Sequence, residues 1–217
     1  MKDSEKVLAF FERWAGDFDR YYEAATKNFL SKSLDFLFRQ SIQERFRLTL
    51  DECASEKNLS VLDVGCGSGR YDVALAQQGA SSIVGIDFSP KMIAMANRLA
   101  QRNRLEDRCR FLNQDFLNVN FNETFDVTLA IGLFDYTREP WVYLEKMKRL
   151  TKRKIIASFP ARWRLRNAIR VPRLKILNCP LYFYTPATIA QAFQRAGISN
   201  FTINNIGRDY FVSALLP

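Results

Sequence analysis

The chain has 217 residues, of which 47% are hydrophobic and 25% charged, a composition typical of one soluble globular domain. No apolar run approaches the about 20 residues that span a bilayer. The N-terminal stretch MKDSEKVLAFFERW lacks the basic start and plain apolar run of a secretory signal. The four cysteines are scattered, with no Cys-x-x-Cys pair, so the sequence indicates neither a disulfide framework nor a zinc site. A reduced, cytoplasmic setting is expected.

The net charge of +9 comes from one segment. Residues 146–175 hold twelve Lys or Arg and no Asp or Glu, whereas the rest of the chain is close to neutral. A charge run is often only a solvated face, but an anionic partner is an equally good interpretation of this one. The chain contains no histidine, the usual general base and the commonest metal ligand, and no metal site is expected.

Helical patterns precede the first strand. Residues 4–23 form one aromatic-rich helix or two, and a longer helix follows, with apolar residues at helical spacing between residues 30 and 42. We expect residues 1–55 to form a helical lid segment that excludes water from the site, with Tyr21 or Tyr22 at the acceptor pocket. Residues 56–217 then form the main domain.

From residue 60 onward, short apolar strands alternate with amphipathic helices. Strands are predicted at SVLDVG, SIVGID, CRFLNQD, FDVTLAIG, KIIASFP, FTINNI and DYFVSAL, and helices at YDVALAQQGA, PKMIAMANRLAQRN, WVYLEKMKRL and TPATIAQAFQRAGI. This alternation predicts an α/β fold, with a parallel sheet covered on both faces. The ligand is then expected beyond the carboxyl ends of the strands.

The stretch VLDVGCGSGR interrupts the pattern with Gly65, Gly67 and Gly69. A redox dinucleotide fingerprint needs Gly-x-Gly-x-x-Gly, and here Arg70 takes the third glycine position, so the helix packing through that position is expected to be lost. The loop still permits a tight turn and close approach to a ligand. Asp87 ends the second strand, where a carboxylate accepts hydrogen bonds from ribose hydroxyls and repels a 2′-phosphate. These residues favour a nucleoside ligand without a pyrophosphate over NAD or NADP.

The series VLDVGCGSG, GIDFSPKMIAMA, FLNQDF and FDVTLAIGLFDY resembles the class I S-adenosylmethionine-dependent methyltransferases across about residues 60–160. The resemblance implies a Rossmann-like sheet of seven mostly parallel strands with an antiparallel last strand, and S-adenosyl-L-methionine as cofactor. The cofactor contacts that it implies are the loop of Gly65, Gly67 and Gly69 under the methionine part, Asp63 near the amino group, Asp87 on the ribose, Phe88 and Met92 beside the adenine, Asp115 and the Phe116 backbone at the adenine edge, and Ile131 and Gly132 on the methionine side. Core packing is the alternative role for Phe88 and Met92, and capping of a helix or turn for Asp87 and Asp115.

The segment IGLFDYTREP after the fourth strand has no Asn/Asp-Pro-Pro-aromatic motif, so methylation of a nucleic-acid base is disfavoured. It looks more like small-molecule O-methyltransferases of quinone and porphyrin pathways, which implies Asp135 and Tyr136 as catalytic candidates. Asp135 is either a base whose pKa is raised by burial or the N-cap of a helix beginning near Thr137. Tyr136 fits a pocket wall better than a catalyst.

A carboxylate acceptor needs no base, because it is already an anion at pH 7. The basic insert, about residues 160–184, combines arginines that grip an acid group with aromatic residues that pack on a flat ring, among them Arg162, Trp163, Arg164 and Arg166. The stretches FFERWAGDFDRYY, FDY, SFP and GRDYFVSALL are loosely similar to magnesium protoporphyrin IX O-methyltransferases. Together these features predict a methyltransferase for a small, anionic or ring-containing acceptor, with oxygen as the favoured atom.

Other interpretations stay open. The basic segment 146–175 lies on an anionic membrane and serves a lipid or quinone acceptor, or it binds RNA phosphates with Trp163 or Tyr182 stacked on a base. Alternatively, the chain is a module that binds the cofactor without catalysis. The sequence shows no sign of an obligate protein partner.

Overall fold

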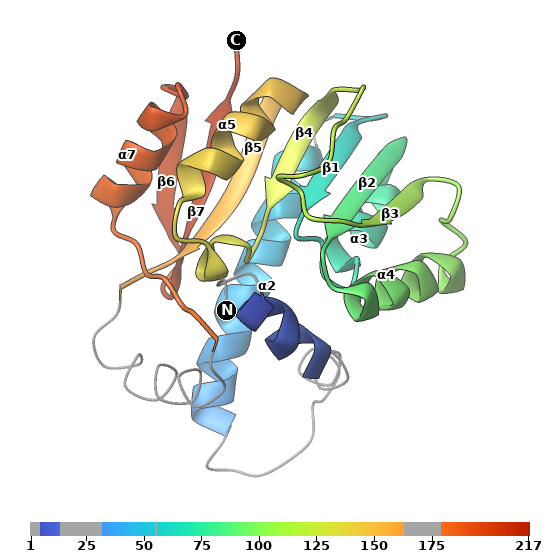
Figure 1. Ribbon diagram of the computed structural model, residues 1–217, viewed down its shortest axis with the longest axis horizontal. Coiled ribbons are helices and arrows are strands. Elements are labelled where there is room, and N and C mark those ends of the chain that lie inside the picture. Colours follow the sequence, from blue (N-terminus) through green and yellow to red (C-terminus); the bar gives the residue numbers. More distant parts are fainter. Residues whose placement is uncertain (1–4, 14–31, 55, 163–178) are drawn as a thin grey trace.

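The computed structural model of the protein describes residues 5–13, 32–54, 56–162 and 179–217 (Figure 1). Its strands form one sheet in the order β3-β2-β1-β4-β5-β7-β6. The strands are β1 (Ser60–Val64), β2 (Ser82–Asp87), β3 (Cys109–Asn113), β4 (Phe125–Ala130), β5 (Thr151–Pro160), β6 (Phe201–Asn205) and β7 (Asp209–Leu215). Strands β1 to β5 pair in parallel, whereas β7 is antiparallel to both β5 and β6. The predicted seven-stranded, mostly parallel sheet with an antiparallel last strand is confirmed.

Helices cover both faces of the sheet (Figure 1). On one face lie α2 (Lys32–Ala54), α3 (Arg70–Gln78) and α4 (Pro90–Arg102), and on the other α5 (Pro140–Leu150) and α7 (Pro186–Arg195). Successive residues of β1 serve the two layers: Val61 clusters with Val73 of α3, and Leu62 with Leu144 of α5. Because both faces are covered, the central strands are almost continuously apolar.

Two helices begin where their sequences predict. The Ser89 hydroxyl accepts a hydrogen bond from the Met92 N–H and caps α4, which has proline at its first position. Thr185 and Thr188 form a reciprocal capping box at the start of α7, again followed by proline.

The segment between β4 and α5 differs from its prediction. A short 3₁₀ helix, η1 (Phe134–Tyr136), follows β4, and α5 begins only at Pro140. Asp135 lies inside η1 and Glu139 precedes the first turn of α5, so Asp135 is not the N-cap of that helix. A single 3₁₀ turn leaves no periodic signal in a sequence, which explains the error.

Residues 5–13 form a helix at the edge of the sheet where β4 ends (Figure 1). The end of α2 belongs to the opposite layer, where Thr49 and Cys53 are buried and Lys154 of β5 donates to Glu52 over 2.8 Å. The C-terminal end of α2, just before the predicted domain boundary at residue 55, therefore packs into the same hydrophobic core as the sheet. Among the described helices, none has both the length and the apolar character needed to cross a bilayer.

Candidate functional site

The glycine loop turns sharply back toward β2. Gly65, Gly67 and Gly69 have φ angles of 76°, 55° and 76°, in the left-handed region that favours glycine. The Gly65 N–H donates to the Ile86 carbonyl over 2.8 Å, and the Cys66 N–H donates to the same oxygen. This pair of hydrogen bonds joins the loop to the end of β2.

The glycines of this loop have different surroundings. A Cβ on Gly69 would lie 2.8 Å from the Ala96 Cβ, so this glycine lets the loop pack tightly against α4. Close packing of the loop is thus made by Gly69, one residue before the third glycine position of the dinucleotide fingerprint, which Arg70 occupies. A Cβ on Gly67 would meet nothing within 4 Å. The backbone at Gly67 thus faces space that a ligand can fill.

Asp87 connects the loop to the start of α4. One carboxylate oxygen accepts the Gly67 N–H over 3.0 Å, and the other accepts the Ser89 N–H over 2.8 Å. Burial raises the pKa of Asp87, while these backbone donors oppose the rise. The carboxylate is therefore held in one orientation at the carboxyl edge of the sheet.

A second carboxyl group, that of Asp72, lies beside Asp63, and no sequence motif indicated it. Asp63 near the end of β1 and Asp72 in the first turn of α3 are both buried, with Asp72 fully inaccessible. Among the described residues, the Asp63 carboxyl group is the only side chain that forms a hydrogen bond with Asp72. Burial raises the pKa of Asp63 to about 7, where a hydrogen bond with Asp72 works against the rise and the Asp87 charge adds to it. Burial and the Asp63 charge also raise the pKa of Asp72, so the two groups share a proton in the neutral range.

The residues expected beside the adenine divide into buried and exposed groups. Met92 is 1% exposed, and the Phe116 ring stacks on Tyr143 at 6.0 Å. Phe88 packs partly buried beside the N-terminal helix, where it joins the small cluster around Val7. Asp115 is exposed, and its carboxylate accepts from nearby groups of its own turn. All of these residues lie at the carboxyl edge of the sheet, as Asp87 does.

Behind the loop that follows β4 lies a polar network that sequence reasoning missed. The Ser158 hydroxyl accepts the Gly132 N–H over 2.8 Å and receives a second hydrogen bond from Arg45 of α2. Arg45 also lies 3.6 Å from the Asp209 carboxylate. Gly132 has φ 81°, and it follows Ile131 at the end of β4. The network fixes the backbone on the expected methionine side, and no motif links its members in sequence.

The catalytic candidates lie under the N-terminal helix. Asp135 is buried with 6% exposure, and Tyr136 is partly buried. The Tyr136 ring packs edge-on against Phe11 at 5.3 Å and lies 6.4 Å from Phe10. On its other side the helix is attached to α4, because Glu12 accepts a hydrogen bond from Ser89 over 2.8 Å. Helix 5–13 thus covers the region between η1 and the start of α4.

Most of the expected acceptor residues lie outside the described part of the chain, namely Tyr21, Tyr22, Trp163, Arg164 and Arg166. Arg162 is described and exposed, and its N–H donates to the Tyr184 carbonyl over 3.1 Å.

Part of the basic segment 146–175 has structural partners. Several of its charged groups bind carbonyls or carboxylates from distant parts of the fold, namely Lys146, Lys148, Lys152, Arg153 and Lys154. The charge that is open to a ligand is therefore smaller than the sequence suggested. Within the described ranges, no group of three or more His, Cys, Asp or Glu has the arrangement of a metal site.

The comparisons with known proteins agree with this geometry. The family described as "Methyltransferase domain" matches residues 55–167. A sterol 24-C-methyltransferase of Debaryomyces hansenii is 28% identical over 132 residues, which cover 60% of this chain and 35% of that protein. A mitochondrial ubiquinone biosynthesis O-methyltransferase of Candida albicans is 30% identical over 124 residues, which cover 54% of this chain and 38% of that protein. The chain therefore spans little more than a third of the length of these curated relatives.

Among solved structures, the magnesium protoporphyrin IX methyltransferase of Synechocystis with bound S-adenosylhomocysteine has a TM-score of 0.75. The match covers 99% of each chain at 22% identity. At this identity the likeness shows a common fold, including the sheet and its edge.

Proposed function

The chain belongs to the methyltransferase domain family, whose members use S-adenosylmethionine, and we propose that it methylates an oxygen atom of a small, anionic or ring-containing acceptor. The observation that carries this proposal is the junction at Asp87. Its carboxylate joins the Gly67 N–H of the glycine loop to the Ser89 N–H at the start of α4, at the edge where ligands of parallel sheets bind.

The residues at this edge fit an adenosyl ligand. Gly67 leaves open space beside the loop backbone, and Asp87 offers two fixed oxygens suited to a pair of ribose hydroxyls. Asp63 supplies a carboxyl group for a cationic amino group, and the partly buried Phe88 supplies apolar surface for a base, with Met92 buried at the start of α4. When bound, S-adenosylmethionine supplies a methyl group on a cationic sulfur, and transfer to an oxygen nucleophile leaves a neutral thioether.

The chain has two tasks in this reaction: to align the acceptor oxygen and to exclude water. Helix 5–13 serves the second task, since Phe10 and Phe11 pack on Tyr136 and so cover η1. An acid acceptor is ionised at neutral pH and needs no base. For a hydroxyl acceptor, Asp135 is the proton acceptor that we propose, because it is the carboxyl group inside η1.

The oxygen acceptor draws support from two relatives whose names refer to magnesium protoporphyrin IX and to O-methylation in ubiquinone biosynthesis. The sterol relative methylates carbon, so relatives of this family differ in acceptor. We favour oxygen here because the chain has no histidine, and an ionised acid group needs none.

Calorimetry with S-adenosylhomocysteine and transfer of a labelled methyl group test the proposal. Asp87→Asn should weaken the binding of S-adenosylhomocysteine by about tenfold or more, because charged hydrogen bonds to the ribose are lost. Asp107→Asn, at an exposed position, should bind normally. Label should appear in carboxylated or phenolic ring compounds. Saturable NAD binding without S-adenosylhomocysteine binding would overturn the cofactor assignment, and label only in RNA or lipid would overturn the acceptor class.

A further inference from the structure

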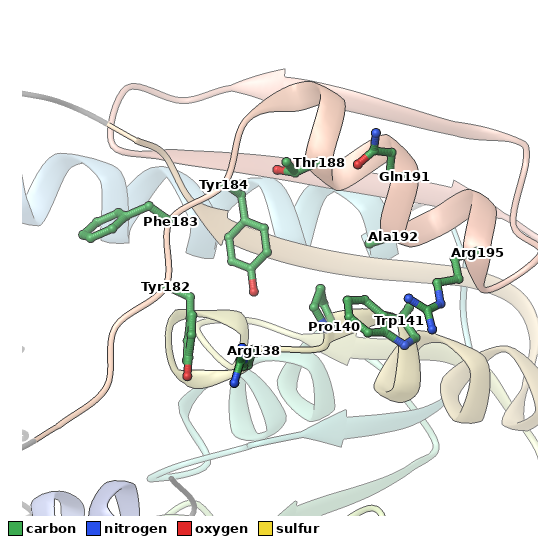
Figure 2. A pocket seen from close by; sticks show the side chains of 10 residues that line it. All are labelled: Arg138, Pro140, Trp141, Tyr182, Phe183, Tyr184, Thr188, Gln191, Ala192 and Arg195. Atoms are coloured by element: carbon green, nitrogen blue, oxygen red, sulfur yellow. The ribbon is translucent and has the colours of Figure 1, made fainter.

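A cavity of about 350 Å³ lies between the first turn of α5, one face of α7 and the extended segment before α7 (Figure 2). Its lining contains no residue of the glycine loop and none of the turn between β2 and α4. The cavity is thus distinct from the residues proposed to hold the cofactor. Its volume is sufficient for a small organic molecule.

The lining carries two arginines and no acidic residue. The Arg195 guanidinium lies over the Trp141 ring, 4.0 Å from the ring centroid. Stacking occupies the flat face of a guanidinium and leaves the N–H donors at its edge available for a planar acid group. The stack therefore holds Arg195 ready for bidentate hydrogen bonding.

Arg138 provides the second positive charge, from the turn before α5 (Figure 2). Within the described part of the chain, neither cavity arginine lies at ion-pair distance from a carboxylate. Other arginines of the domain do form such pairs, including Arg47, Arg110 and Arg153. The two cavity arginines thus combine an uncompensated positive charge with aromatic neighbours, which suits an anion that carries a ring.

The back wall of the cavity is joined to the proposed acceptor side. The Tyr182 N–H donates to the Asp135 carbonyl over 2.9 Å, and the Tyr184 hydroxyl donates to the Thr137 carbonyl over 2.5 Å. Figure 2 shows both tyrosine side chains facing the cavity. A ligand in the cavity therefore contacts a wall that is hydrogen-bonded to the middle of η1 and to the residue that follows it.

We propose that this cavity binds a planar aromatic anion, with Arg195 on its acid group, Tyr182 beside its ring and Arg138 as a second positive charge of the lining. In the enzyme it holds the end of the acceptor that is not methylated. This inference rests on the proposed function, because only an anionic, ring-containing acceptor uses such a site.

Calorimetry with 2-naphthoate and its neutral amide, 2-naphthamide, tests the cavity directly. The acid should bind about tenfold more tightly than the amide, because only the acid is attracted by the positive charge of the lining and forms charge-assisted hydrogen bonds to an arginine. Arg138→Gln combined with Arg195→Gln should abolish this preference. Arg149→Gln, an exposed arginine of α5 outside the lining, should keep it.

Equal affinities of the unmodified protein for acid and amide would overturn the inference, as would an unchanged preference in the double variant. Displacement of 2-naphthoate by equimolar inorganic phosphate would also overturn it, because the ring would then contribute nothing. Binding of S-adenosylhomocysteine reports on folding in every variant. If the double variant no longer binds S-adenosylhomocysteine, the single variant Arg138→Gln, at an exposed turn, is used instead, and its preference for the acid should be reduced. Failure of the unmodified protein to bind S-adenosylhomocysteine would instead count against the proposed function. The naphthoate measurement would still decide whether the cavity binds an aromatic anion.

Discussion

The Glu12 carboxylate of the N-terminal helix accepts a hydrogen bond from the Ser89 hydroxyl, which also caps α4. The same carboxylate accepts the Lys91 N–H and lies 3.6 Å from the Lys91 ammonium group. Partial burial works against ionisation of Glu12, but the hydrogen bonds from Ser89 and Lys91 and the Lys91 charge outweigh it, and the pKa is lowered. A single side chain thus attaches helix 5–13 to the edge of the proposed cofactor site.

Replacing Glu12 by Gln should loosen this helix while the sheet stays intact. The ion pair and hydrogen bonds of Glu12 are partly exposed, so we expect the free energy of local unfolding of helix 5–13 to fall by about 1 kcal/mol or less. This corresponds to up to about fivefold faster amide hydrogen exchange within residues 5–13. Glu106→Gln, on an exposed loop, is the matched control. Unchanged exchange in the Glu12 variant would show that apolar contacts alone hold the helix. Because the pKa is lowered, the attachment persists above the ordinary Glu range and weakens as the pH falls through the folded pKa.

Substitution of Gly69 by Ala should mainly lower stability, whereas substitution of Gly67 by Ala should mainly weaken cofactor binding. At Gly69 the new methyl group meets the Ala96 Cβ at 2.8 Å in addition to an unfavourable φ, so unfolding free energy should fall by about 2 to 4 kcal/mol. At Gly67 only the φ strain applies, about 1 kcal/mol, but the methyl group enters the space proposed for the cofactor. Urea unfolding and calorimetry with S-adenosylhomocysteine separate the two effects. Full cofactor affinity in the Gly67 variant would contradict the proposed path of the cofactor.

Asp72→Asn should stabilise the protein, and more so at higher pH. Folding brings Asp72 and Asp63 together and raises both pKa values, Asp63 to about 7. The folded state therefore holds a proton that the unfolded chain loses near pH 4, and stability falls as the pH rises through this window. Removing the Asp72 carboxylate removes its share of this loss, while Asp63 stays buried, so the stabilisation should grow between pH 5 and pH 8, on the order of 2 kcal/mol.

Urea unfolding at pH 5, 7 and 8 measures the effect of Asp72→Asn, with exposed Asp107→Asn as control. A difference from the parent protein that does not vary with pH would show that the two carboxyl groups do not share a proton.

The sheet was predictable because each of its strands carries a local apolar signal, and α4 and α7 because Ser89 and Thr185 precede a proline. The positions of Asp87 and the glycines at the carboxyl edge were predictable for the same reason, because each lies at or just after the end of a predicted strand. Asp72 was missed because an acid in the first turn of a helix usually complements the helix dipole. Only the packing of α3 under β1 brings it to Asp63.

Charge shows the same limit. In the sequence, residues 146–175 contain no acid, yet Lys154 pairs with Glu52, Lys152 with Asp126 and Arg153 with Glu56. These partners are about 26 to 102 residues away along the chain, a separation that only the fold closes. Linear charge counts therefore overstated the positive surface open to a ligand.

The place of β1 inside the sheet has an additional consequence for how the protein is made. Strand β1 pairs on one side with β2, which follows it closely in the sequence. On its other side it pairs with β4, where Ser60 hydrogen-bonds to Asp126, 66 residues further along the chain. Parallel pairings of such long range form slowly, and an uncovered strand edge invites pairing with other chains. During synthesis this chain should thus pass through a stage with β1 half-paired, when chaperone contact matters most.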